Sequence, residues 1–128
     1  MSGRAIVLID HGSRLPEANA VVEQVAALLR ERLPGTPIEV AHLELAPPDL
    51  AEAVARCVAR GATEVVVQPF FLAPGRHSTR DIPALAAAAA ERHAGVSVRV
   101  SEPLGAQPAL VDAVLERLSA GAGRPRSG

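Results

Sequence analysis

The chain has 128 residues, the size of one ordinary domain, and its 48% hydrophobic and 21% charged residues are typical of a folded globular protein. Thirteen basic and fourteen acidic side chains give a net charge of −1, which offers no support for a nucleic acid or an anionic membrane as partner. All thirteen basic residues are arginines, so Schiff-base chemistry and the lysine of a phosphate-binding P-loop are both excluded.

The first half of the chain alternates between short apolar segments and amphipathic ones. Arg4–Asp10 (RAIVLID) is a continuous apolar run, typical of a strand buried on both faces. Apolar residues then recur every three or four positions over 16–33, which predicts a helix. Residues 37–43 are predicted as the second strand, and a capping box predicts that a second helix covers 49–61.

The second half repeats this alternation. Residues 63–68 (TEVVVQ) are rich in β-branched side chains and predict the third strand. A long connection over 69–80 leads to an alanine-rich helix predicted at 81–93, and the fourth strand is predicted at 96–101. The last helix is expected to begin near Pro108, since proline favours the first turn.

The order βαβαβαβα predicts an α/β fold with a four-stranded parallel sheet and helices on both faces, because strands separated by helices need right-handed crossovers. Residues 1–119 are expected to form one domain, and 120–128 (AGAGRPRSG) a disordered tail. Nothing at the N-terminus resembles a targeting signal. With one cysteine and so no internal disulfide, the protein is expected to be cytoplasmic.

Polar residues follow the predicted strands at the point where each strand ends. His11 follows the first strand, Glu44 ends the second, and His77 belongs to the connection after the third. Because ligands of open α/β sheets bind beyond the carboxyl ends of the strands, we expect these three side chains to share one edge. Two imidazoles and a carboxylate suit a borderline divalent metal such as Co, Fe, Ni or Zn, or a proton-transfer role.

Each of these residues also has a plainer interpretation. His11 could be a turn residue, His77 an exposed loop residue and Glu44 a solvated carboxylate. Three arginines, Arg14, Arg76 and Arg80, could be surface charges or anchors for an anionic substrate. Three other candidates are better explained by structural roles. His42 is expected to be a packed strand histidine, His93 a histidine at a helix end and Cys57 a core thiol.

The motifs at the strand ends resemble those of the sirohydrochlorin chelatases, in particular the small, single-lobe form of the class II, ATP-independent enzymes. The resemblance covers about residues 4–119. It is carried by an apolar strand running into His11-Gly12-Ser13-Arg14, by Glu44-Leu45-Ala46, by Gln68-Pro69-Phe70-Phe71-Leu72, and by Gly75, His77 and Asp81-Ile82-Pro83.

The resemblance implies a role for each matched residue. His11 matches a metal-binding histidine that is also the proton acceptor, and His77 matches the second metal-binding histidine. Glu44 and Ala46 match a segment that contacts substrate, with Glu44 as the catalytic acid of this strand. The loop that holds the macrocycle matches Leu72, Ala73, Pro74, Gly75 and Arg76. Pro47-Pro48 departs from the family, where an acidic residue often precedes a single proline.

The function implied by the resemblance is insertion of Co²⁺, or of Fe²⁺ or Ni²⁺, into sirohydrochlorin in cobalamin or sirohaem biosynthesis. The metal is then a substrate, and no permanent cofactor is expected. One lobe supplies half the walls needed to enclose a macrocycle, so a homodimer is expected. Two alternatives stay open: a non-catalytic carrier of metal or tetrapyrrole, and a nucleotide-binding module, which the absence of a glycine-rich phosphate loop disfavours.

Overall fold

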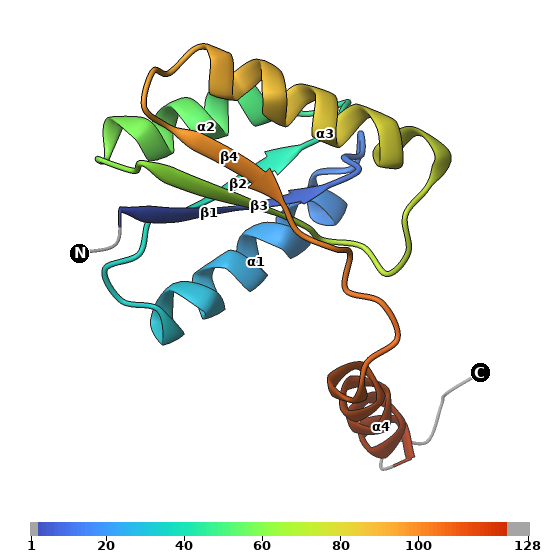
Figure 1. Ribbon diagram of the computed structural model, residues 1–128. Helices are drawn as coiled ribbons and strands as arrows, with labels where there is room; N and C mark the ends of the chain where they lie inside the picture. Colours follow the sequence, from blue (N-terminus) through green and yellow to red (C-terminus); the bar gives the residue numbers. More distant parts are fainter. Residues whose placement is uncertain (1–2, 123–128) are drawn as a thin grey trace.

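The computed structural model describes residues 3–122, without the side chains of His77, Gly121 and Ala122. Its four strands form one parallel sheet in the order β2-β1-β3-β4, so the predicted α/β fold is confirmed (Figure 1). The elements in chain order are β1 (Arg4–Asp10), α1 (Pro16–Arg32), β2 (Ile38–His42), α2 (Leu50–Ala59), β3 (Glu64–Pro69), α3 (Arg76–Glu91), β4 (Ser97–Val100) and α4 (Pro108–Ala122).

Helices α2 and α3 pack on one face of the sheet and bury the larger part of the core. Val7, Ile9, Val65 and Val67 of the central strands are fully buried there. The alanine run of α3 contributes side chains small enough for the helix backbone to approach the sheet closely. Burial on both faces explains why β1 and β3 read as nearly continuous apolar runs.

The opposite face is covered by α1, whose Val22 and Ala26 pack on Leu8 and on the edge strand β2. Arg30 of α1 donates to the carbonyl oxygen of Ile38 in β2 through its Nη2 atom, at 2.7 Å. This hydrogen bond holds α1 over the β2 side of the sheet.

The predicted twelve-residue connection over 69–80 is wrong, because α3 begins at Arg76. The Ser78 hydroxyl accepts a hydrogen bond from the Gly75 N–H at 2.8 Å, and the Thr79 hydroxyl donates to the Gly75 carbonyl at 2.8 Å. These bonds close the first turn, a type of local side-chain capping that was not identified from the sequence. His77 therefore lies in the first turn of a helix rather than in a loop.

Helix α4 lies apart from the sheet, at the end of the segment that follows β4 (Figure 1). It continues through Ala122, three residues into the stretch predicted to be disordered. Residues 123–128 of that predicted tail lie outside the described part of the chain. Among the described residues, no helix is both long and apolar enough to cross a membrane.

Cys57 lies on the core-facing side of α2 and has no exposed surface, as its place on the apolar stripe of the predicted helix indicates. Burial raises the pKa of its thiol to about 12, so the reactive thiolate is scarce near neutral pH. We expect a maleimide to label the native protein far more slowly than the urea-unfolded chain. Equal rates in mass-spectrometric labelling would contradict the buried position.

Candidate active site at the carboxyl edge of the sheet

The chain segments after β1 and β2 are joined backbone to backbone at this edge. The Leu43 N–H donates to the Asp10 carbonyl at 2.9 Å, and the Glu44 N–H donates to the His11 carbonyl at 3.1 Å. Gly12 makes this approach possible: its φ is +87°, and a Cβ atom there would lie 1.8 Å from the Glu44 carbonyl oxygen. These two backbone hydrogen bonds hold His11 and Glu44 next to each other, at the shared edge that the sequence predicts.

The His11 ring stacks on the ring of Phe71, with 4.5 Å between ring centroids and an interplanar angle of 21°. Phe71 belongs to the connection between β3 and α3, which the Phe70 N–H anchors by donating to the Ile9 carbonyl at 2.6 Å. His11 is otherwise exposed. The stack therefore orients an accessible imidazole, and Phe71 is a site residue whose role was not predicted from the sequence.

A buried pair lies beside this junction. His42 is 3% exposed, and its Nδ1 atom lies 2.6 Å from Asp10 Oδ1. The backbone N–H of His42 also donates to the Pro48 carbonyl at 2.9 Å. This hydrogen bond ties the end of β2 to the loop before α2. The prediction that His42 is a packed strand histidine is confirmed. Its buried ring has a hydrogen-bond partner in Asp10, the residue directly before His11.

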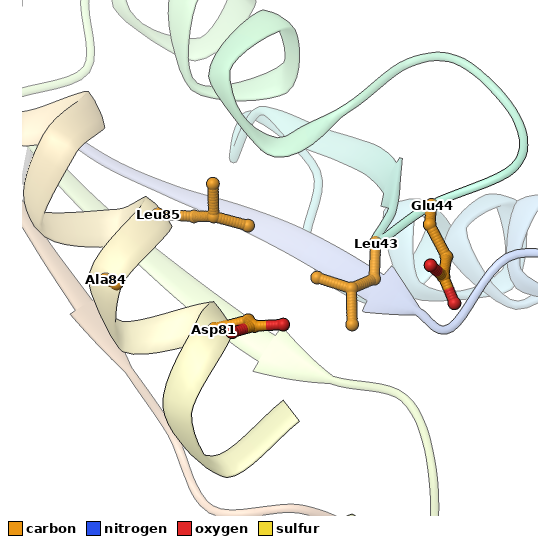
Figure 2. Close-up of a pocket in the computed structure, with 5 residues that line it drawn as sticks. All are labelled: Leu43, Glu44, Asp81, Ala84 and Leu85. Atoms are coloured by element: carbon orange, nitrogen blue, oxygen red, sulfur yellow. The ribbon is translucent and has the colours of Figure 1, made fainter. Parts of the chain in front are cut away.

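A cavity of about 400 Å³ opens next to Glu44, between the end of β2 and the face of α3. Figure 2 shows its lining, in which the Asp81 carboxylate points from α3 toward Leu43 and Glu44. Asp81 had no predicted role. Because α3 begins at Arg76, Asp81 lies in the second turn of the helix rather than at its start, next to the cavity that Leu43 and Glu44 also line.

The remaining predicted binding residues form the rim of this edge. Ala46 is half-buried, and Leu72, Ala73, Pro74 and Arg76 are exposed. Gly75 is the N-cap residue of α3. His77 lies at the second position of α3, and its side chain lies outside the described structure. The described side chains contain no group of three acidic, cysteine or histidine residues placed to hold a metal ion, so the predicted pairing of His11 with His77 stays a prediction.

The loop that carries Phe71 is fixed from its other side by the segment after β4. Gln68 Nε2 donates to the Glu102 carbonyl at 2.8 Å. The Leu104 N–H donates to the Phe71 carbonyl at 3.0 Å, and the Gly105 N–H to the Leu72 carbonyl at 2.9 Å. The connection after β3 is thus held between β1 and the chain leaving β4, which makes it a rigid support for the His11 ring.

A larger cavity of about 610 Å³ lies at the opposite edge of the sheet. In the part of the chain that the structure describes, its charged lining residues are Arg4 and Arg60. Among the described residues that line it there is no histidine or carboxylate.

Comparison with known proteins places these features in context. The CbiX family model matches residues 5–120. The chloroplastic sirohydrochlorin ferrochelatase of Arabidopsis thaliana is 43% identical over 113 residues, which cover 88% of this chain and 50% of the relative. The sirohydrochlorin cobaltochelatase of Methanopyrus kandleri is 33% identical over 134 residues, covering 89% of this chain and 94% of the relative.

Two solved structures share the fold. A CbiX protein from Marinobacter aquaeolei, described as a cobalamin biosynthesis protein, superposes with a TM-score of 0.81 at 32% identity, covering 95% of this chain and 99% of its own. The sirohydrochlorin chelatase SirB of Bacillus subtilis, in complex with cobalt, gives 0.82 at 29% identity, covering 91% of this chain and 50% of its own. This chain therefore spans half of the plant and Bacillus proteins and nearly all of the other two.

Proposed function

Because this chain belongs to the CbiX family, we propose that it is an ATP-independent chelatase that inserts a divalent metal ion into sirohydrochlorin. The observation that carries the proposal is the accessible His11 ring, which stacks on Phe71 and is joined through its backbone to Glu44. This constellation lies within the residues matched by the family.

Metal insertion exchanges one M²⁺ ion for the two protons carried by the pyrrole nitrogens of the macrocycle. A neutral imidazole can ligate a metal ion or accept a proton, and the exposed ring of His11 is placed at this edge for either role. Glu44 and Asp81 lie beside the same cavity, where carboxylates can receive protons and pass them to solvent. We assign metal binding and proton acceptance to His11. Glu44 and Asp81 are assigned the transfer of the released protons to solvent.

Substrate binding is assigned to the rim around His11. Leu72 is 59% exposed and offers an apolar contact to the macrocycle. Arg14 follows β1, Arg76 and Arg80 belong to the first two turns of α3, and all three are exposed. Guanidinium groups bind carboxylates through paired hydrogen bonds. Since sirohydrochlorin carries many carboxylates, we propose that these arginines bind its periphery.

Several finer assignments belong to the same proposal. His77 would be the second metal ligand, the metal would be a substrate rather than a permanent cofactor, and Co²⁺ is the first choice over Fe²⁺ and Ni²⁺. Imidazole and carboxylate ligands do not select among these ions by themselves. We also propose that the protein is a homodimer, because one lobe supplies half of the walls needed to enclose a macrocycle, and that it works in the cytoplasm.

Turnover separates an enzyme from a carrier of metal or tetrapyrrole. Anaerobic mixtures would contain sirohydrochlorin and Co²⁺, Fe²⁺ or Ni²⁺ in about twentyfold excess over protein, with insertion followed in the visible spectrum of the macrocycle. A chelatase forms many metallated products per chain, at a rate above that of the protein-free mixture. Binding without acceleration would overturn the proposal in favour of the carrier.

Replacing Asp81 by asparagine tests the second carboxylate. We expect the Asp81→Asn variant to lower kcat by about 10- to 100-fold, since an amide cannot accept a proton as a carboxylate does. Glu91→Gln, at the exposed far end of the same helix, is the matched control and should keep the full rate. Unchanged steady-state kinetics in Asp81→Asn would remove this residue from the mechanism.

A further inference from the structure

Two hydrogen-bonded pairs lie on either side of His11 in the chain. The residue before His11 is Asp10, whose side chain is hydrogen-bonded to His42 of β2. Two residues after His11, the backbone of Ser13 is hydrogen-bonded to the side chain of Asn19 in α1. The exchange of a metal ion for protons assigned above uses neither His42 nor Asn19, so the reaction steps leave both pairs without a role.

The Asp10–His42 pair joins the ends of two neighbouring strands. Asp10 and His42 are opposite residues of the parallel strands β1 and β2, and the tautomer of His42 with its hydrogen on Nδ1 donates the 2.6 Å bond to the carboxylate. The two side chains are 3% and 17% exposed, so water competes little for this bond. Together with the bond from the Leu43 N–H to the Asp10 carbonyl, it fixes the point at which His11 leaves β1.

The Asn19–Ser13 pair attaches the other side of His11 to helix α1. Asn19 Nδ2 donates to the Ser13 carbonyl at 2.7 Å, and the Ser13 N–H donates to Asn19 Oδ1 at 2.9 Å. One amide side chain thus satisfies both backbone groups of Ser13. Asn19 is placed by α1, which packs on the sheet through Val22 and Ala26. The turn after His11 is therefore attached to an element that the core holds in place.

The position of the His11 ring depends on the backbone that carries it. The ring stacks on Phe71, and the residue is otherwise exposed. Gly12, the next residue, is at a φ of +87°, and glycine has more backbone freedom than any other residue. Hydrogen bonds on both sides of His11 and Gly12 restrict this freedom. The restriction matters for catalysis, because a displacement of about 1 Å in a reacting group can cost about 100-fold in rate.

We propose that Asp10, His42 and Asn19 are positioning residues, which fix the backbone around His11 so that its imidazole meets the metal ion and the pyrrole protons in one orientation. This role rests on the proposed function, and none of the three side chains is assigned a contact with metal or macrocycle. A purely structural role predicts a different result, namely a loss of stability with an unchanged rate per folded molecule.

Replacing Asn19 by alanine tests the pair that lies outside the core. We expect kcat for Co²⁺ insertion to fall by about 10- to 100-fold, because the His11 ring is no longer held in one place. Asn19 is half-buried, so the variant should fold, which circular dichroism and urea unfolding would check. Gln24→Ala removes an exposed amide from the same helix and should keep the wild-type rate. A folded Asn19→Ala variant with wild-type kcat would overturn the positioning role.

Two substitutions of His42 test the buried pair. His42→Ala removes the hydrogen-bond donor to Asp10, whereas His42→Asn keeps an N–H group near the position of Nδ1. We expect kcat to fall by about 10- to 100-fold in His42→Ala and to return to within about threefold of wild type in His42→Asn. An equal loss of kcat in both folded variants would contradict a role for this hydrogen bond.

The double variant Asn19→Ala/His42→Ala tests whether both pairs act on the same ring. Its loss of kcat should be smaller than the product of the two single losses, because a ring already displaced by one substitution has less to lose from the other. Losses that multiply would overturn a common action on His11.

Nuclear Overhauser effects between ring protons give a readout that does not depend on turnover. The chain has four histidines and two phenylalanines, so few ring signals need assignment. The rings of His11 and Phe71, whose centroids lie 4.5 Å apart, should give a cross-peak in wild type and Gln24→Ala and a weaker one in Asn19→Ala and His42→Ala. If the wild-type protein does not accelerate insertion, the proposed function fails, while this cross-peak still decides the positioning role. An undiminished cross-peak in both alanine variants would overturn it.

Discussion

Replacing His11 by alanine is expected to lower the rate of metal insertion by at least about 100-fold, the scale at which a positioned acid or base contributes. The His11 ring is exposed and touches Phe71, and its backbone hydrogen bond to Glu44 does not involve the side chain. The fold should therefore persist while the metal ligand and proton acceptor are lost. The check is the anaerobic initial rate, with thermal unfolding followed by circular dichroism.

His93→Ala is the matched control for this prediction. His93 lies two residues beyond the end of α3, at the opposite end of that helix from the candidate site, and its loss should leave the rate within about twofold of wild type. Equal rates for wild type and His11→Ala would contradict the assignment of His11. A fall in both variants would point to a general effect of histidine removal rather than to the site.

Replacing Gly12 by alanine is expected to destabilise the protein by about 2–4 kcal/mol, in the upper range for single substitutions. The φ of +87° is unfavourable for a residue with a side chain. In addition, the new Cβ would lie 1.8 Å from the Glu44 carbonyl oxygen, a backbone atom that cannot rotate away. The loop after β2 must shift, so urea unfolding should show the loss of stability and the insertion assay a loss of rate.

Gly35→Ala separates the two contributions. Gly35 has nearly the same φ, +89°, but an added Cβ would meet no atom within 4 Å. Its cost should be the backbone strain alone, about 1 kcal/mol. If both variants lost the same free energy of unfolding, the close contact between Gly12 and Glu44 would be refuted.

The sheet could be predicted from the sequence because its signals are local. Buried parallel strands need continuous apolar runs, and RAIVLID and TEVVVQ are such runs, bounded by residues that end strands. The rule that ligands bind beyond the strand ends then located His11 and Glu44 at one edge. The family resemblance on the same motifs is confirmed by the matched family model.

The rest of the site depends on contacts that no local pattern encodes. The start of α3 is set by Ser78 and Thr79 bonding back to Gly75, a contact that the alanine-rich pattern over 81–93 does not encode. The prediction therefore placed Asp81 at the first residue of the helix instead of in its second turn. The Asp10–His42 hydrogen bond joins residues 32 apart in sequence, so no local pattern predicts it.

Paramagnetic line broadening by Co²⁺ tests most directly whether the metal binds at the His11 edge. Amide signals of the isotopically labelled protein would be followed during a Co²⁺ titration, with diamagnetic Zn²⁺ as reference. We predict that the amides of residues 10–12, 43–44 and 70–72 broaden first, and that those of Gly35, Gly61 and Gly95 at the opposite edge stay sharp. Broadening centred on the opposite edge or on His93, with the His11 region unaffected, would contradict the account.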